Sequence, residues 1–337
     1  DIKNKSLKLE GSNSIHFDKL LIATGSVPVR PPIPGIDLPG VHPCWTLEDA
    51  RAIQKLAKPG ARVLQMGAGF IGCIILEALA SKNVKLTVVE MGDRMVPRMM
   101  TEVAGNLIKT WVEEKGIAVH TNTKVESITQ SQSGLLVKLS NGETIEVDLV
   151  ISATGVKPNI EFLKNSNLQI QRGILVNEQM QTSHPDIYAA GDVTESVDFC
   201  TGERIINAIQ PNAADQASIA ACNMAGGHAT AVGSLQVNVL DTLGLISSSF
   251  GQWSGIQGGQ HVERCNPDQY QYIRLEFDQD RLIGATSLGM TDHVGAIRGL
   301  IQTRVALGDW KEKLLHDPLR IMDAYLAKAQ AQANWVA

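Results

Sequence analysis

Three closely spaced glycines and a carboxylate that follows them are the residues of this chain best suited to chemistry. Gly67, Gly69 and Gly72 follow an apolar run at 62–66, and Glu90 ends a second apolar run at 86–90. The order predicts a buried strand, a glycine turn, a helix start and a second parallel strand with an acidic end. A glycine triplet alone could be a Gly-rich turn after a buried strand. The complete pattern predicts a dinucleotide-binding unit.

Each glycine of this motif has its own expected role. Gly67 permits a tight turn, Gly69 lets the backbone approach a pyrophosphate, and Gly72 lets the helix pack close to the strand. The helix N-terminus offers free N–H groups and a positive dipole end to the phosphates. Glu90 would accept hydrogen bonds from an adenosine ribose. The predicted dinucleotide-contacting residues are Gly67, Gly69, Phe70, Ile71, Gly72 and Glu90.

A second pattern occurs twice in the chain. An apolar run ends in Ala-Thr-Gly at 23–25, and another ends in the same tripeptide at 153–155. A proline follows three residues after each glycine, as Pro28 and Pro158. The repeat suggests two related nucleotide-binding units, although coincidence between Ala/Gly-rich turns is the alternative. Glycine at a strand end also lets the backbone come close to a ligand.

A third signal combines a turn, a short apolar strand and Gly191-Asp192. An isolated aspartate there would more simply cap a helix or form an Asx-turn. Further on, residues 210–221 predict a helix that begins at Gln210, with Pro211 in its first turn. The positive end of that helix could face an electron-rich ring carbonyl.

Composition narrows the classes of function. The chain has 337 residues, 44% hydrophobic and 19% charged, with a net charge of −5 and only 4% aromatics. These values are typical of a globular protein and predict no nucleic-acid partner. The longest apolar stretch, 63–80, contains polar residues and glycines, so it predicts no membrane span. No targeting segment is visible, although the first residue is not Met, which leaves a removed leader possible.

The five cysteines lie at positions 44, 73, 200, 222 and 265, and none forms a C-x-x-C motif. No metal-type spacing occurs either, despite eight histidines. We therefore predict no metal site and small buried thiols. Scattered thiols in a chain of this size favour a reducing compartment, which we take as the cytoplasm.

Together these motifs resemble the FAD-dependent pyridine nucleotide oxidoreductase superfamily. Within it, the chain resembles the branch of rubredoxin and ferredoxin reductases and the flavin portion of NADH-dependent nitrite reductases. The resemblance implies that the Ala-Thr-Gly motifs lie where the FAD and NAD domains join, that Asp192 binds the flavin ribitol, and that the helix near Pro211 points at the flavin ring. The implied cofactors are FAD and NAD, with NADP less favoured. The implied FAD-side residues are Thr24, Gly25, Gly191, Asp192 and Gln210, with Arg30 as a weaker candidate. Gly155, from the second Ala-Thr-Gly motif, is a further cofactor-binding candidate.

Two features depart from that family. Its FAD fingerprint, a glycine motif in the first strand–helix unit, is missing, and only 22 residues precede Ala23. We expect the chain to start inside a domain, with residues 1–17 as the tail of a β-meander, and to bind FAD poorly when expressed alone. Second, Ile74 stands where the family helix usually carries a glutamate near the nicotinamide–flavin contact.

The predicted fold class is α/β, with two Rossmann-like domains and a small C-terminal α+β domain. The FAD-side domain, incomplete at its N-terminus, comprises 1–55 and 151–235. The NAD domain comprises 56–150, and the C-terminal domain 236–337. Expected elements are a helix at 46–58, strands at 62–66, 86–90 and 117–120, and a hairpin of 135–139 with 144–147 around Asn-Gly. In the last domain we expect strands near 270–277 and 282–287, helices near 292–307 and 318–335, and a possible homodimer contact.

The predicted activity is that of an NAD(P)H-dependent flavoprotein reductase. Hydride would pass from nicotinamide to flavin with no protein acid or base, and electrons would pass to a small electron-carrier protein or an attached metal centre. Glu90 favours NADH over NADPH, while Arg94 and Arg98 keep NADPH open. The net negative charge favours a neutral or basic surface on the protein partner. The alternative is a non-catalytic nucleotide-binding subunit or sensor that keeps the fold.

Overall fold

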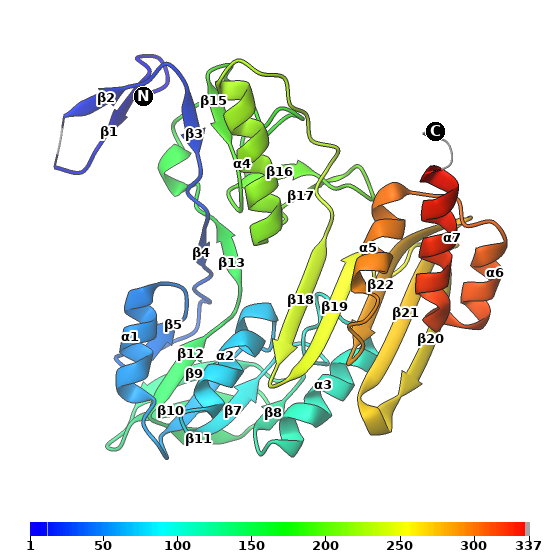
Figure 1. The fold of residues 1–337 in the computed structure, drawn as a ribbon. Helices are drawn as coiled ribbons and strands as arrows, with labels where there is room; N and C mark the ends of the chain where they lie inside the picture. The colour runs from blue at the N-terminus through cyan, green and yellow to red at the C-terminus, as the bar shows by residue number, and fades with distance from the viewer. Residues whose placement is uncertain (12, 334–337) are drawn as a thin grey trace. The chain divides into compact units, whose positions relative to one another are not determined.

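The structure is a computed structural model that describes residues 1–11 and 13–333. The chain divides into two compact units, shown in Figure 1. Unit 1 joins Asp1–Val27 to Val156–Gln236, and unit 2 joins Pro28–Gly155 to the chain from Val237 onward. The α/β fold class is confirmed, while the three-domain boundaries stay a prediction. Each unit is described by itself.

Unit 2 contains a five-stranded parallel sheet in the order β5-β12-β6-β7-β8. Its strands are β5 (Val41–Pro43), β12 (Leu149–Ser152), β6 (Arg62–Met66), β7 (Lys85–Val89) and β8 (Ala118–His120). The three predicted strands are confirmed to within one residue at each end. Val63, Leu64, Leu149 and Val150 are buried, as expected for parallel strands that are covered on both faces.

Three helices connect these strands: α1 (Leu47–Leu56), α2 (Phe70–Ala80) and α3 (Glu102–Glu114). Thr46 and Asp49 form a reciprocal capping box that fixes the start of α1, within the helix expected at 46–58. Thr101 caps α3 through the backbone N–H of Ala104. In contrast, α2 begins at Gly69 with no side-chain cap. The first turn of α2 therefore keeps backbone N–H groups that no side chain satisfies.

An antiparallel meander of β9 (Val125–Gln130), β10 (Leu135–Leu139) and β11 (Thr144–Val147) follows β8. The predicted hairpin strands are confirmed, and Gly142 takes the positive φ that the turn requires. Beside this hairpin, the guanidinium of Arg62 pairs with Glu146 at 2.8 Å and with Asp148 at 2.6 Å. Hydrogen bonds from Ser133, Arg62 and Ser131, in that order of effect, hold the pKa of Glu146 below its usual value, and hydrogen bonds from Arg62 do the same for Asp148.

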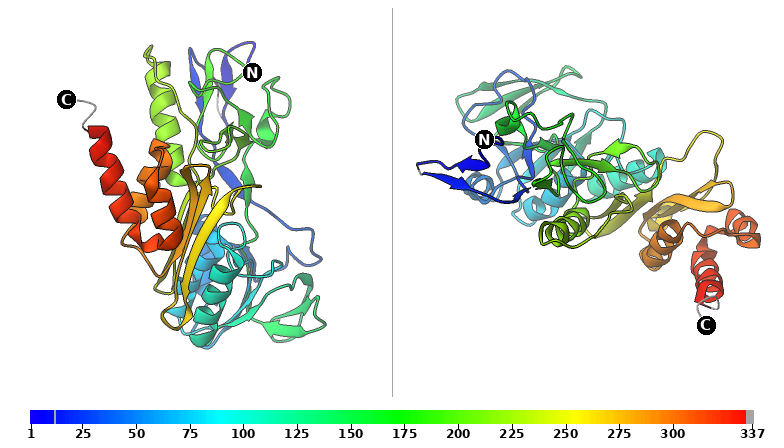
Figure 2. Two further views of the ribbon diagram at one scale, coloured as in Figure 1. Left: turned by 90° about the vertical axis from the view of Figure 1, so that its right-hand side faces the viewer. Right: turned by 90° about the horizontal axis from the view of Figure 1, so that it is seen from above.

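The C-terminal part of unit 2 is an antiparallel sheet in the order β18-β19-β22-β21-β20. Its strands are β18 (Val237–Thr242), β19 (Leu245–Gly251), β20 (Gln260–Asn266), β21 (Gln271–Asp278) and β22 (Arg281–Leu288). Helices α5 (Val294–Thr303), α6 (Asp309–His316) and α7 (Ile321–Ala333) follow, and Figure 2 shows α5 and α7 side by side. β21, β22 and α5 match the expected elements, and so does α7, although positions 334 and 335 of its expected range lie outside the described residues. β18, β19, β20 and α6 were not predicted.

This sheet shares one hydrophobic core with the parallel sheet, to which it contributes Leu240, Leu245, Tyr272 and Leu288. The indole N–H of Trp111 on α3 donates to the carbonyl of Thr242 at 3.1 Å. The Trp111 ring also packs edge-on against Tyr270, and the ammonium of Lys115 lies 4.0 Å from its centre. These contacts explain why the two sheets belong to the same compact unit.

Unit 1 is built on a parallel pair, β3 (Leu20–Ile22) with β15 (Ile187–Ala189). The hairpin β1 (Ser6–Lys8) and β2 (Ser14–His16) precede this pair. The unit also contains β14 (Ile174–Leu175), β16 (Thr194–Val197), β17 (Arg204–Ile205), a short helix η1 (Glu161–Leu163) and α4 (Gln210–Met224). The strands β4 (Ser26–Pro28) and β13 (Val156–Pro158) pair at the edge of the unit. Ile22, Ile174, Ile187 and Ala220 lie in its core.

Within the described residues, no helix combines the length and the apolar character needed to cross a membrane.

Candidate nucleotide-binding site

The glycine motif lies at the carboxyl end of β6, and each glycine meets a different steric demand. Gly67 has φ +98°, and a Cβ there would lie 2.5 Å from the carbonyl oxygen of Ala153. Gly72 is buried on α2, and a Cβ there would lie 2.4 Å from the carbonyl oxygen of Gly67. A Cβ on Gly69 would meet nothing within 4 Å. Two glycines are thus required by packing, and the middle one borders open space.

This open space adjoins the uncapped N-terminus of α2, an 11-residue helix. Phe70 is partly exposed and Ile71 is half-buried in its first turn. An anion at this position would receive backbone N–H groups and the positive end of the helix dipole. The residues therefore fit the diphosphate of a dinucleotide.

Glu90 directly follows β7, and its carboxylate is held beside the glycine turn. One carboxylate oxygen accepts the backbone N–H of Ala68, and the other accepts that of Gly92, both at 2.7 Å. Each carboxylate oxygen has a second lone-pair direction, which can accept a ribose hydroxyl. The carboxylate is thus fixed at the strand end that the sequence indicated.

The two arginines that follow Glu90 differ in their surroundings. The Arg94 guanidinium donates to the carbonyl of Met100 at 3.0 Å and pairs with Asp93 at 2.8 Å. The Arg98 side chain is exposed, and its Nη1 lies 4.0 Å from where a Cβ would stand on Gly155. Gly155 follows β12, the strand next to β6. The structure therefore brings Arg98 and Gly155 to the same sheet edge as the glycine motif.

In unit 1, Gly25 and Gly191 follow the adjacent parallel strands β3 and β15. Their φ values are +66° and +82°. A Cβ on Gly25 would meet nothing within 4 Å, whereas one on Gly191 would lie 3.4 Å from Ala213 of α4. The Thr24 hydroxyl donates to the carbonyl of Asn159 at 3.0 Å. Both glycines therefore lie at the edge where parallel sheets bind nucleotides.

Asp192 is held in place by residues that the sequence analysis did not single out. One of its carboxylate oxygens accepts the Ser26 hydroxyl at 2.7 Å. The side-chain oxygen of the buried Gln216 accepts the backbone N–H of Gly191 at 2.8 Å and the hydroxyl of Thr194 at 2.9 Å. Ser26 directly follows the first Ala-Thr-Gly, which was the available sequence signal, whereas no local pattern indicated Gln216.

The helix α4 begins at Gln210, as predicted, and has Pro211 in its first turn and no side-chain cap. An uncapped 15-residue helix, an open Gly25 and a fixed Asp192 carboxylate fit the polar groups of a flavin and its ribitol. Arg30 lies in unit 2, not with the other FAD-side candidates, and it is exposed and paired with Asp37. Its contact with FAD stays a prediction.

The hollows beside α1 contain none of the candidate nucleotide-binding residues. Their volumes are about 410 and 440 Å³. Among the described residues, no group of three or more His, Cys, Asp or Glu side chains could hold a metal ion. Ile74 is 51% exposed on α2.

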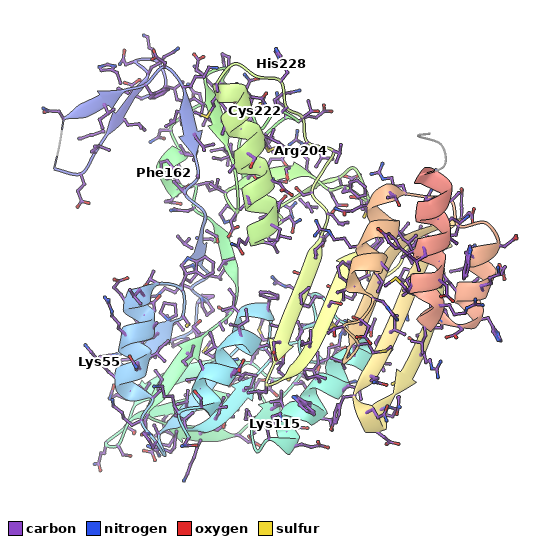
Figure 3. The ribbon with its side chains drawn as sticks, viewed as in Figure 1. Lys55, Lys115, Phe162, Arg204, Cys222 and His228 are labelled. Carbon is purple, nitrogen blue, oxygen red and sulfur yellow. The ribbon has the colours of Figure 1, made fainter. Side chains whose placement is uncertain are left out.

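The cysteines that the structure describes are unbonded and differ in burial. Cys73 is fully buried on α2, and burial raises its pKa to about 12. Cys222 is exposed near the end of α4, as Figure 3 shows, and Cys265 is exposed on β20. The expectation of small buried thiols therefore fits Cys73 and not these two residues.

Comparison with known proteins identifies the family. Residues 1–217 match the model of the pyridine nucleotide-disulphide oxidoreductases. The chain is 31% identical over 317 residues to the NADH-dependent phenylglyoxylate dehydrogenase subunit epsilon of Aromatoleum evansii, covering 93% of this chain and 75% of that one. It is 27% identical over 304 residues to the rubredoxin-NAD(+) reductase of Pseudomonas putida, covering 90% and 78%.

Among solved structures, the NAD-dependent persulfide reductase from A. fulgidus matches with a TM-score of 0.84 and 29% identity. The match covers 92% of this chain and 62% of that one, so the chain spans less than two thirds of the compared structure. The resemblance expected from the glycine, Ala-Thr-Gly and Gly-Asp motifs is thereby confirmed. The chain belongs to the pyridine nucleotide-disulphide oxidoreductase family, a family of oxidoreductases whose cofactors are FAD and NAD(H).

Proposed function

We propose that this chain is the nucleotide-handling body of an NADH-dependent flavoprotein reductase. The observation that carries the proposal is the open space at Gly69, bordered by the uncapped N-terminus of α2 and by a fixed Glu90 carboxylate. An anionic diphosphate and a ribose with free hydroxyls are the groups that this combination would bind best.

In this proposal the chain's own residues bind and orient the two nucleotides. Gly67, Gly69 and Gly72 shape the diphosphate site, Phe70 and Ile71 border it, and Glu90 accepts the ribose hydroxyls. Thr24, Gly25, Gly191, Asp192 and Gln210 contact FAD, whereas Gly155 borders the dinucleotide at the sheet edge of unit 2. Bound FAD can take up a hydride and release its electrons singly. No side chain is assigned as acid or base, since transfer between stacked rings requires none.

The proposed electron acceptor is a small iron–sulfur protein or an attached metal centre. The relative from Pseudomonas putida is named for rubredoxin, a protein of this kind. No two of the five cysteines occur at redox-motif spacing, and Ile74 replaces a carboxylate typical of disulfide reductases. The names of the relatives do not favour the non-catalytic alternative. A homodimer and a cytoplasmic location remain predictions.

The acceptor is tested by steady-state NADH oxidation with the full-length protein. Ferredoxin, rubredoxin, glutathione disulfide and oxygen are compared at equal concentrations. We expect faster turnover with an iron–sulfur protein than with the disulfide. The reverse order would overturn the assignment of the acceptor.

The proposed preference for NADH over NADPH has a separate basis. The Glu90 carboxylate would repel a 2′-phosphate and accept a free ribose hydroxyl. Arg94 is already engaged with Asp93 and Met100, so it is not free to bind that phosphate. We expect tighter binding of NADH than of NADPH by the unmodified protein, and a smaller difference after Glu90→Ala. Titration of both nucleotides checks this, and tighter NADPH binding by the unmodified protein would contradict it.

A further inference from the structure

The segment 91–101, which we call the arginine loop, contains a strained turn next to the glycine motif. Val96 has φ +51° and is 1% exposed. A β-branched residue in the left-handed region is a genuine outlier, because its side chain crowds the backbone. Such a conformation persists only where the surroundings hold it in place, and it often does so at functional sites.

The contacts of Val96 show what the strained turn holds. Its backbone N–H donates to the carbonyl of Ala68 at 2.8 Å, and its own carbonyl accepts the N–H groups of Met99 and Met100 at 3.1 Å. Glu90 holds the N–H of Ala68. Ala68 is therefore fixed through both its backbone N–H and its backbone carbonyl. The chain runs from Glu90, which holds the N–H, to Val96, which holds the carbonyl, and Arg98 follows two residues later.

Arg98 carries a guanidinium with no assigned partner. Within residues 1–11 and 13–333 it forms neither a hydrogen bond nor an ion pair. Its Nη1 lies 4.0 Å from the Cβ position of Gly155, and apart from that atom the space above Gly155 is empty to 4 Å. An exposed cation beside a side-chain-free strand end can receive an anion without steric hindrance.

The strand order indicates which anion would reach this cation. The order is β12-β6-β7, so β6 separates Gly155, which follows β12, from Glu90, which follows β7. Two strand spacings amount to roughly 10 Å. The Arg98 guanidinium thus lies on the far side of the glycine turn from the carboxylate expected to bind the adenosine ribose. It is placed for the middle of a dinucleotide and not for a 2′-phosphate.

We propose that Arg98 binds the diphosphate of the dinucleotide, together with the backbone N–H groups at the start of α2. The strained Val96 turn makes this possible, because it sends the chain from the end of β7 across the glycine motif to Gly155. The inference rests on the proposed binding of NADH and adds a residue to that site. It also means that neither Arg94 nor Arg98 serves a 2′-phosphate.

The test compares Arg98→Gln and Arg98→Lys with the unmodified protein in titrations of NADH, NADPH, ADP-ribose and adenosine. A charge-assisted hydrogen bond corresponds to about 10- to 100-fold in affinity. We expect Arg98→Gln to weaken NADH, NADPH and ADP-ribose by similar factors in that range and to leave adenosine unchanged. Arg98→Lys should restore part of the loss. Arg51→Gln, which removes another exposed guanidinium of unit 2, is the control and should change nothing.

The possible results of these titrations distinguish failure of the proposed role of Arg98 from failure of the proposed binding of NADH. A loss confined to NADPH would assign Arg98 to the 2′-phosphate, and a loss that includes adenosine would make its role structural. Either result would overturn the inference, as would unchanged NADH affinity in Arg98→Gln. A thermal unfolding curve that matches the unmodified protein establishes that the variant is folded. Failure of the unmodified protein to bind NADH would instead overturn the proposed function.

Discussion

Substituting Gly69 with serine should raise the stability of the protein while lowering its affinity for NADH. Gly69 has φ −79° and ψ −169°, an extended conformation that serine adopts readily, and a Cβ there would enter open space. At the N-cap of α2, the introduced serine hydroxyl could accept a backbone N–H that no side chain now satisfies. As a cap, serine gains only a few tenths of a kcal/mol over glycine, and its smaller conformational freedom in the unfolded chain adds about 0.4–1 kcal/mol.

The introduced side chain would also occupy the approach of the diphosphate. Its Cβ and hydroxyl would lie where the backbone now borders open space beside the helix N-terminus. We expect NADH to bind at least about tenfold more weakly, which corresponds to a loss of about 1.4 kcal/mol. Stability and affinity should therefore move in opposite directions.

The matched control is Gly67→Ala, two residues earlier. An alanine at φ +98° adopts a strained backbone, which costs about 1–2 kcal/mol. Its Cβ would also lie 2.5 Å from the carbonyl oxygen of Ala153, and relieving such overpacking costs about 1–3 kcal/mol. The expected sum is a destabilisation of about 2–5 kcal/mol.

The assay is thermal unfolding together with fluorescence titration of NADH. For a domain of this size, 1 kcal/mol changes the Tm by about 2–4 °C. The Tm of Gly69→Ser should rise by up to roughly 4 °C, whereas that of Gly67→Ala should fall by roughly 4–20 °C. Two results would refute the reasoning: a Tm for Gly69→Ser as low as that of Gly67→Ala, or a Gly69→Ser variant that binds NADH normally.

Two further predictions concern ionisable side chains. Hydrogen bonds lower the pKa of Glu146, chiefly from Ser133 and then from Arg62, and the pKa of Asp148, from Arg62, below their ordinary values of 4.5 and 3.8. The contribution of both carboxyls to stability is therefore present above those values and is lost as the pH falls through the lowered ones. In urea unfolding between about pH 6 and pH 2, Arg62→Gln should lose less stability on acidification than the unmodified protein, and equal slopes would contradict this. Because Cys73 is fully buried and its pKa is raised to about 12, iodoacetamide should label the exposed Cys222 and Cys265 in the native protein, and Cys73 only after unfolding. Native labelling of Cys73 as fast as that of Cys222 would show that α2 opens readily.

Strands β6, β7 and β8 of the parallel sheet could be predicted from the sequence because their signals are local. The apolar runs, the glycine turn and the Asn-Gly hairpin each specify a conformation within a few residues. The C-terminal sheet was only partly predicted, because its strands break the usual patterns. Three consecutive buried serines, 247–249, interrupt the apolar pattern of β19, while β20 is exposed along most of its length. The helix α6 has only eight residues, too few for a clear period.

The glycine motif was predictable for the same reason, whereas the residues that support the sites were not. Ser26 and its partner Asp192 are 166 residues apart in the sequence. Arg98 reaches Gly155 only because β12, which comes late in the sequence, pairs with β6. Such pairs form only through tertiary packing, so no pattern of neighbouring residues in the sequence predicts them. The strain at Val96 is likewise imposed by its surroundings, since valine itself disfavours that conformation.

The two hydrogen bonds of the Glu90 carboxylate also bear on how this protein could evolve. The residue that would discriminate between the two coenzymes is the same residue that holds Ala68 and Gly92. Losing two charge-assisted bonds costs about 1.5–3 kcal/mol each, a large share of the roughly 5–15 kcal/mol that keeps a typical domain folded. A lineage that exchanged Glu90 to accept NADPH would lose stability before it gained any benefit. Descendants with the altered specificity should therefore carry earlier, compensating substitutions elsewhere in the unit, and the order in which these were acquired would be constrained.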